Sequence, residues 1–130
     1  GSFVEVRNKG EYQIVFHDGA LLRSRGPGRI GVPKLAQDVG ELQLREFRRL
    51  WIYGKTRPLR ALLPDGSVLD MAQSEVYLES ENGRAHLHNH GPEPVRWRGR
   101  MGSVEIPMGR RIEMILDPPD RPFVPADFSV

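Results

Sequence analysis

Three histidines alternate along one short segment of the chain. Alternate residues of a β-strand share one face of the sheet, so His86, His88 and His90 are expected to point the same way. Imidazole nitrogens are frequent ligands of zinc, nickel and iron, which makes this spacing the sharpest candidate metal site. The alternative is the solvent-facing side of a hairpin whose other side, Ala85 and Leu87, packs inward. We favour this alternative and predict no bound metal and no cofactor.

Residues for covalent or acid–base catalysis do not form a recognisable set. The chain has no cysteine, which excludes disulfides, thiolate metal sites and a cysteine nucleophile. The acidic residues from Asp65 to Glu81 are scattered over expected hairpins, and no trio of serine, histidine and acid can be assigned. A G-x-G-x-x-G sequence at 26–31 is followed by Val32-Pro33 rather than by a helix, so it predicts a turn. We therefore predict a protein without enzymatic activity.

Basic residues are strongly biased toward arginine, although the formal net charge is only +2. The planar guanidinium group stacks on rings and makes paired hydrogen bonds, so arginine suits interfaces. The most basic part of the chain offers only Trp51 and Tyr53 for stacking on bases, and the rest of the chain is nearly balanced in charge. We therefore predict weak or no binding to nucleic acid. We predict that a protein partner is bound there by Arg45, Arg48, Arg49, Trp51 and Arg57.

Glycine and proline are frequent enough to indicate a turn-rich β protein: the 130 residues include 14 glycines and 11 prolines. The length suits one domain, and no stretch approaches the roughly 18 apolar residues of a membrane-spanning helix. We predict a mainly β fold, a single β-sandwich or barrel of about eight short strands. Residues 1–116 would form this domain. Residues 33–58 would form a basic insertion with a short helix or long loop, and residues 117–130 a proline-rich extended arm.

Turn residues mark the expected hairpins. Asn8-Lys9-Gly10 and Asp18-Gly19 separate apolar-alternating segments near the N-terminus. Pro64-Asp65-Gly66 and Asn82-Gly83 do the same further on, and Asn-Gly is the favoured pair for a type I′ turn. Short strands are also expected at 95–98, 104–106 and 112–116. The expected core consists of Val4, Val6, Ile14, Phe16, Leu44, Phe47, Leu62, Val68, Val76, Leu78, Leu87, Val95, Trp97, Val104, Ile106, Ile112 and Ile115.

The segment from Glu41 to Trp51 fits two patterns. Leu44, Phe47 and Leu50 fall at helical spacing, which predicts a short helix. Leu42 with Leu44, and later Leu50 with Ile52, also fit the alternation of a strand. We predict the helix and keep the strand as the alternative.

The last segment of the chain, residues 117–130, cannot form a central strand because its prolines lack backbone donors. We predict an extended arm that docks on a neighbouring subunit or partner, with Phe123 and Phe128 as its anchors. Apolar burial of each phenylalanine would contribute about 1–3 kcal/mol.

Parts of the chain resemble three known kinds of β protein. His88-Asn89-His90 with Glu93 resembles the metal-binding turn of the cupins, although Ile112 stands where the later cupin histidine would be. Residues 85–116 resemble the second half of forkhead-associated domains, which implies binding of an anionic peptide. The opening segments, residues 4–10 and 14–19, resemble small β-rich particle proteins of tailed phages, such as capsid decoration and head–tail connector proteins.

The phage resemblance implies a non-enzymatic structural or assembly protein, a capsid or tail component of a virion. It would act through protein–protein contacts in a homo-oligomer or larger assembly, located in the virion or the cytoplasm and away from membranes. A β-sandwich recognition module for an anionic peptide or ligand is the first alternative. A cupin-like metal-binding protein is the second.

Overall fold

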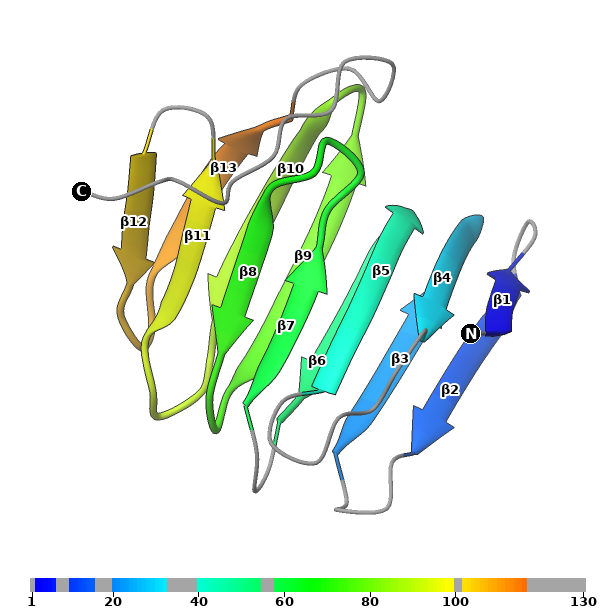
Figure 1. Ribbon diagram of the computed structural model, residues 1–130, viewed down its shortest axis with the longest axis horizontal. Helices are drawn as coiled ribbons and strands as arrows, with labels where there is room; N and C mark the ends of the chain where they lie inside the picture. Colours follow the sequence, from blue (N-terminus) through cyan, green and yellow to red (C-terminus); the bar gives the residue numbers. More distant parts are fainter. Residues whose placement is uncertain are drawn as a thin grey trace.

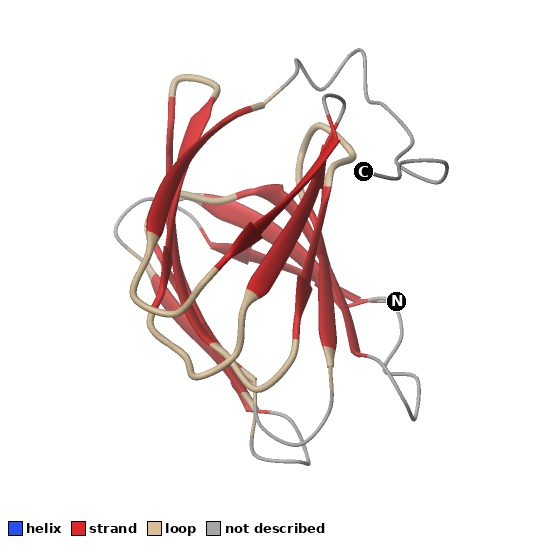
Figure 2. Cartoon of the chain, turned by 90° about the vertical axis from the view of Figure 1, so that its left-hand side faces the viewer, coloured by secondary structure: helices blue, strands red, loops and turns tan. Residues whose placement is uncertain are grey.

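The computed structural model describes residues 2–6, 10–15, 20–32, 40–54, 58–99 and 102–116. These residues form thirteen strands in two sheets that pack face to face, and they contain no helix (Figures 1 and 2). Accordingly, they offer no helix that could cross a membrane. The predicted mainly β sandwich is confirmed. Both sheets have open edges, so the arrangement is a sandwich and not a closed barrel.

The seven-stranded sheet, sheet A, lies in front in Figure 1. Its strands in spatial order are β1 (Ser2–Val6), β4 (Gly28–Val32), β5 (Gly40–Glu46), β7 (Leu59–Leu62), β8 (Val68–Met71), β11 (Val95–Gly99) and β12 (Gly102–Ile106). The six-stranded sheet, sheet B, lies behind it. Its order is β13 (Arg111–Ile115), β10 (Arg84–Asn89), β9 (Glu75–Glu81), β6 (Arg49–Tyr53), β3 (Leu21–Arg25) and β2 (Glu11–Val15).

The chain passes repeatedly from one sheet to the other. It leaves sheet A after β5, crosses sheet B as β6 and returns to sheet A as β7, so β5 and β7 pair in parallel. The other described strand pairs are antiparallel. This path brings β6 beside β9, although the hairpin of β7 and β8 separates them in the sequence.

Alternate residues of the central strands fill the space between the sheets. Leu50 and Ile52 of β6, Leu78 of β9 and Leu87 of β10 are at most 1% exposed. Because side chains alternate across a strand, burial of these residues places their neighbours on the outer face of sheet B. The core thus determines which side chains sheet B presents to solvent.

Turn chemistry correctly predicts the local hairpins. Asn82 and Gly83 have positive φ angles of 52° and 76° and connect β9 to β10, as the type I′ prediction requires. The predicted hairpin around Pro64-Asp65-Gly66 joins β7 to β8. Strands β2 and β3, on either side of residues 18–19, pair antiparallel, and residues 18–19 themselves lie outside the described residues.

Several predictions from the sequence are wrong. The segment 41–51 is not a helix, because Gly40–Glu46 and Arg49–Tyr53 are strands of different sheets. Strand β1 does not form a hairpin with β2; it pairs with β4 in sheet A, while β2 belongs to sheet B. The strands outnumber the predicted eight. Strands β5 and β6 lie within the segment predicted as an insertion, and β4 occupies most of the segment 26–31 that was predicted as a turn.

Two predicted core residues lie outside the core. Ile115 is 70% exposed, because the alternation of β13 turns Ile112 and Met114 inward and Ile115 outward. Val104 is 45% exposed because β12 is the edge strand of sheet A. The predicted core positions Val4, Val6 and Phe16 lie outside the described side chains, and Leu62 is half-buried. The arm at 117–130 also lies outside the described residues.

Candidate functional site

Aromatic and ionisable side chains gather on the outer face of sheet B. They alternate with the buried residues of three neighbouring strands, β6, β9 and β10, and are half-buried or exposed. We call this set the aromatic face. It consists of Arg49, Trp51, Tyr53, Glu75, Tyr77, Glu79, His86, His88 and His90.

Strand register places the rings in a continuous row. Trp51 lies directly opposite Tyr77, and Tyr77 lies directly opposite His88. The ring centroids of Trp51 and Tyr77 are 4.8 Å apart at an interplanar angle of 39°. Those of Tyr77 and His88 are 6.0 Å apart edge to face, and those of His88 and His90 are 5.7 Å apart. Ring pairs at such distances stabilise a sheet by about 0.5–1.5 kcal/mol each beyond their area.

A short hydrogen bond orders the centre of this row. The Tyr77 hydroxyl donates to Oε2 of Glu79 at 2.6 Å, and Nε of Arg49 lies 4.0 Å from the same oxygen. Burial and this hydrogen bond raise the pKa of Tyr77 to about 12. The same hydrogen bond lowers the pKa of Glu79 below its ordinary value, and Arg49 adds to the effect. At neutral pH the pair is therefore a neutral phenol and a carboxylate.

Replacing Tyr77 with phenylalanine is expected to raise the pKa of Glu79 toward its ordinary value, because the donor that favours the carboxylate is lost. Titration of the Glu79 side-chain carboxyl by NMR measures this shift. Tyr53→Phe, on the same face, is the control and should leave the titration of Glu79 unchanged. An unchanged Glu79 pKa in Tyr77→Phe would contradict the hydrogen bond.

The three histidines share one face, as the sequence predicts, but they contact different groups. Nε2 of His86 lies 3.8 Å from Oε2 of Glu113, and its Nδ1 lies 3.4 Å from Nη2 of Arg111. His88 lies between Tyr77, which it meets edge to face, and the tilted ring of His90. Across the described part of the chain, no group of three or more His, Cys, Asp or Glu side chains is arranged to hold a metal ion.

The imidazole of His88 is poorly suited to carry a proton. Burial, followed by the positive charges of Arg111 and the neighbouring histidines, lowers the pKa of His88 below its ordinary value of 6.5, and Glu79 opposes this shift. A histidine with a lowered pKa binds protons more readily in the unfolded chain than in the folded one. Its contribution to stability is therefore complete above pH 6.5 and is lost as the pH falls through the folded pKa.

We expect the free energy of unfolding of His88→Gln to depend less steeply on pH below pH 6.5 than that of the wild type. The free energy of unfolding of the wild type should fall as the pH drops below 6.5, whereas this part of the fall should be missing in the variant. Urea denaturation at a series of pH values measures the difference. Above pH 6.5 the two curves should run parallel. A variant that keeps the full wild-type slope would show that His88 is not responsible.

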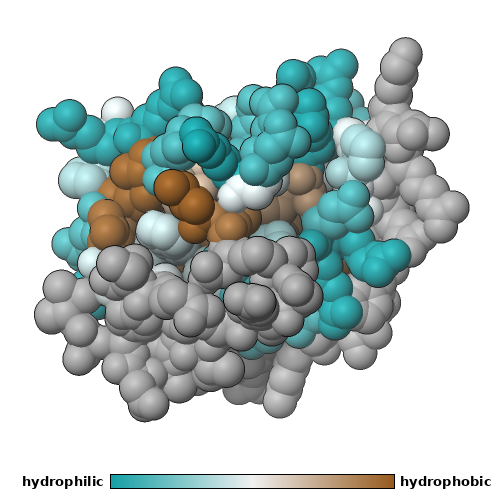
Figure 3. Space-filling model, turned by 90° about the horizontal axis from the view of Figure 1, so that it is seen from above, coloured by the Kyte–Doolittle hydropathy of each residue, from teal (hydrophilic) through white to brown (hydrophobic). Residues whose placement is uncertain are grey.

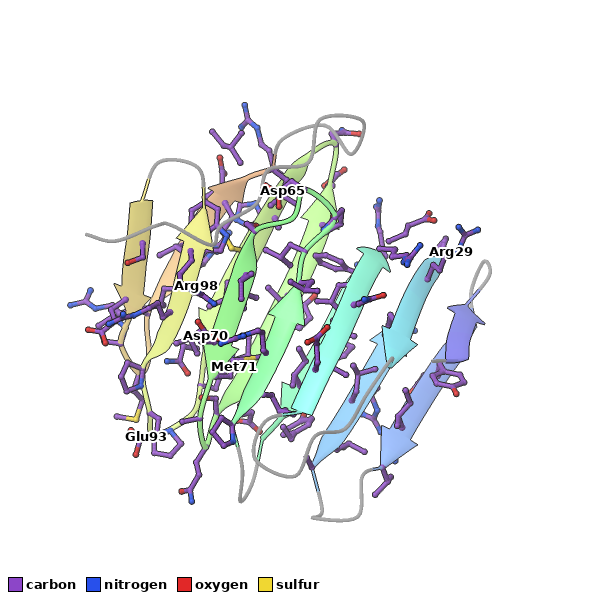
Figure 4. The ribbon with its side chains drawn as sticks, in the orientation of Figure 1. Arg29, Asp65, Asp70, Met71, Glu93 and Arg98 are labelled. Atoms are coloured by element: carbon purple, nitrogen blue, oxygen red, sulfur yellow. The ribbon has the colours of Figure 1, made fainter. Side chains whose placement is uncertain are left out.

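The outer face of sheet A differs, because its charges neutralise one another. Asp70 on β8 accepts hydrogen bonds from Nε of Arg98 at 2.8 Å and from Nε of Arg60 at 3.0 Å. Arg98 and Asp70 point toward each other from neighbouring strands in Figure 4. Arg96 lies 3.5 Å from Glu105 across the edge pair. Among its described side chains this face carries ion pairs between neighbouring strands and no row of rings in contact.

A shallow groove lies at one end of the sandwich, where β5 extends beyond its pairing with β7. It is lined by Gln43, Leu44, Arg45, Leu62, Leu63, Pro64 and Gly66. Figure 3 looks down on this end and shows apolar surface in the middle of the view, with hydrophilic residues above it and to its right. The lining residues belong to sheet A and its hairpin, so the groove is separate from the aromatic face.

The predicted partner-binding residues are only partly brought together. Arg49 and Trp51 lie on the aromatic face, beside the histidines that the sequence singled out separately. Arg45 is exposed on β5 of sheet A, and Arg48 is exposed between β5 and β6. Arg57, Phe123 and Phe128 lie outside the described residues.

Sequence reasoning missed Tyr53, Tyr77, Glu75 and Glu79 as members of the site. The alternation in β9 gives a local signal that Tyr77 and Glu79 point outward. No local pattern reveals that β9 lies beside β6, because that pairing joins strands separated by a hairpin of the other sheet.

No protein-family model matches the sequence, and no curated protein matches it. The fold is similar to that of two crystal structures of a "putative anti-sigma factor" from Parabacteroides distasonis ATCC 8503. Each has a TM-score of 0.69 and 8% sequence identity over 89% of this chain. The chain spans 60% of the length of each matched protein. At this identity the likeness shows the fold alone.

This comparison corrects the resemblance to phage particle proteins. The solved structures that share the fold are described as an anti-sigma factor and not as a capsid, tail or connector protein. The predicted role as a structural virion component, with its virion location, is therefore wrong. The matched structures are not described as cupins or forkhead-associated domains either. What the chain shares with the two crystal structures is a β-sandwich over nearly nine-tenths of its length.

Proposed function

We propose that this chain is the β-sandwich part of a regulator of the anti-sigma-factor kind. It acts by binding a protein partner and not by catalysis. The similarity of fold to the crystal structures described as an anti-sigma factor supports this role. Regulators of this kind, as their name states, act on a protein, so the chain needs a surface suited to protein recognition.

The aromatic face is that surface. Tryptophan, tyrosine and arginine are the residues that most often dominate the binding energy of protein interfaces. Here Trp51, Tyr77 and Arg49 lie on adjacent strands of one sheet, and the row of rings continues through His88. This row is the observation that carries the proposal. On sheet A, by contrast, Asp70 is held by two arginines of its own sheet.

The protonation states of the central residues favour binding over acid–base chemistry. An efficient general acid or base has a pKa near the working pH. The pKa of Tyr77 is raised to about 12, and the pKa of Glu79 is lowered, so the two groups are shifted away from neutrality in opposite directions. At the centre of the face, Tyr77 and Glu79 therefore form a fixed pair of a phenol and a carboxylate.

A transcription experiment in the source organism tests the proposal. The gene is deleted and then restored as wild type or as Trp51→Ala/Tyr77→Ala, with all neighbouring coding sequence retained. Deletion should change the transcripts of genes that depend on one sigma factor, as RNA sequencing measures. The wild-type gene should restore them and the double variant should not, at equal protein level. The matched control, Arg96→Ala/Glu105→Ala on sheet A, should restore them.

Two results would contradict the proposal. If deletion leaves every sigma-dependent group of transcripts unchanged, the regulatory role is wrong. If the Trp51→Ala/Tyr77→Ala protein restores transcription as fully as the wild type, the aromatic face is not the binding surface.

A further inference from the structure

We propose that the aromatic face binds a cationic side chain of the partner, an arginine or lysine in a basic segment. This inference rests on the proposed function, because it takes the aromatic face as the partner-binding surface. The side chain would lie against the rings of Trp51 and Tyr77 and pair with a carboxylate of β9.

The outer side of β9 is acidic. Glu75 and Glu79 alternate with the buried Val76 and Leu78 and flank Tyr77, and Glu81 ends the strand. Register places Glu75 opposite Tyr53, and Glu79 opposite Arg49. Tyr77 therefore lies between two carboxylates along β9, and Tyr53 lies opposite Glu75, an arrangement that suits a positively charged group. Trp51 lies between Tyr77 and Arg23 of β3.

The carboxylates on the outer side of sheet B differ in whether they form an ion pair within the chain. Glu79 pairs with Arg49, Glu11 with Arg23 at 3.2 Å, and Glu113 with Arg84 at 3.5 Å. Within the described part of the structure, no cation lies within ion-pair distance of Glu75 or Glu81. Glu75, beside Tyr53 and next to the ring row, is thus an exposed carboxylate that forms no ion pair with another described residue.

The rings themselves favour a cation. The faces of tryptophan and tyrosine rings carry partial negative charge and attract guanidinium and ammonium groups. The hydroxyl of Tyr77 points to Glu79 and stays protonated, and burial disfavours the charged form of His88. The cations Arg25 and Arg111 belong to the flanking strands β3 and β13, and not to the strands that carry Trp51 and Tyr77.

An NMR titration tests the inference directly. The isotope-labelled chain is titrated with the peptide Ac-Gly-Arg-Ala-Arg-Gly-amide at neutral pH and low salt. We expect saturable shifts of the Trp51 indole N–H and of the amides of β6 and β9. The matched peptide Ac-Gly-Glu-Ala-Glu-Gly-amide should cause no such shifts. Trp51→Ala and Glu75→Gln should each raise the dissociation constant about five- to tenfold.

Matched variants separate charge from folding. Glu75→Gln keeps the shape of the side chain and removes only its charge, so its spectrum should otherwise match the wild type. Glu105→Gln removes a carboxylate from sheet A and should leave the dissociation constant unchanged, because Glu105 already faces Arg96 on the other side of the sandwich.

Other outcomes would overturn the inference. Preference for the glutamate peptide would mean that the arginines of the face select an acidic partner. Equal binding by Glu75→Gln would show that the Glu75 carboxylate does not contribute to recognition. Chemical shift changes confined to sheet A would show that the peptide binds elsewhere than on the aromatic face. If the arginine peptide does not bind while the Trp51→Ala/Tyr77→Ala gene fails to restore transcription, the proposed function stands and the cationic partner is wrong. If both experiments fail, the aromatic face has no binding role.

Discussion

Gly91→Ala is expected to lower the free energy of unfolding by about 3 kcal/mol, one of the two largest effects in the molecule. A β-carbon at position 91 would overlap the backbone nitrogen of Glu75 and would lie 2.6 Å from the α-carbon of Ser74. That backbone cannot move away freely. The N–H of His90 donates to the carbonyl of Glu75, and the N–H of Gly54 donates to the carbonyl of Ser74, both at 2.7 Å. The loss should also disturb the aromatic face, because Glu75 and His90 belong to it.

Urea denaturation compares Gly91→Ala with Gly83→Ala. Gly83 has a φ of 76°, and a β-carbon there would meet no atom within 4 Å. Its substitution therefore carries only the conformational cost of a left-handed residue, about 1 kcal/mol. If Gly91→Ala is no more destabilising than Gly83→Ala, the close approach of the 91 and 74–75 segments is wrong.

Asn89→Ala is expected to destabilise the fold by about 3 kcal/mol as well. The buried amide of Asn89 donates to the carbonyls of Glu93 and Ile106, both at 2.9 Å, and accepts from the N–H of Gly91 at 3.0 Å. It thus joins the end of β10 to the turn that follows and to the end of β12 in the other sheet. Alanine leaves these backbone groups without their partner in a place that water reaches poorly.

The matched control for Asn89→Ala is Asn82→Gly. Asn82 is an exposed turn residue with a φ of 52°, a conformation that glycine adopts without strain, so this change should alter stability by less than about 0.5 kcal/mol. Chemical denaturation of both variants gives the comparison. A loss of under about 1 kcal/mol in Asn89→Ala would mean that the three hydrogen bonds contribute little.

Local turn chemistry made part of this fold predictable. Both central residues of a type I′ turn have positive φ, and Asn followed by Gly adopts this conformation most readily. The Asn82-Gly83 pair therefore predicts the hairpin of β9 and β10. The partner of β1 does not follow in this way. Strand β1 pairs with β4, more than twenty residues further along, and turn residues indicate only pairings between strands that are adjacent in the sequence.

The helix predicted for residues 41–51 shows how a crossing between sheets imitates helical spacing. Leu44 ends the inward alternation of β5, and Leu50 begins that of β6. Phe47 lies between the strands and is 5% exposed, because the chain passes over the core there. The resulting spacing of three residues between inward side chains is the period of a helix turn. It arises here from two strands and a connection.

The candidate site was predictable residue by residue but not as a surface. Trp51 and Arg49 stand out in a basic segment, and the histidines stand out by alternation. Their meeting depends on the pairing of β6 with β9 and of β9 with β10. That pairing is long-range, since β7 and β8 intervene in the other sheet, and only the three-dimensional structure brings Tyr77 between Trp51 and His88.

Site-specific photo-crosslinking in the source organism tests most directly whether the aromatic face binds the partner. A p-benzoylphenylalanine residue replaces Tyr53 on the aromatic face or, in a second strain, Arg96 on sheet A. Irradiation should give one dominant adduct from position 53 and none from position 96. Mass spectrometry should identify a protein whose deletion changes the same sigma-dependent transcripts, crosslinked through a segment containing arginine or lysine. An adduct with that protein from position 96 and not from position 53 would contradict the account.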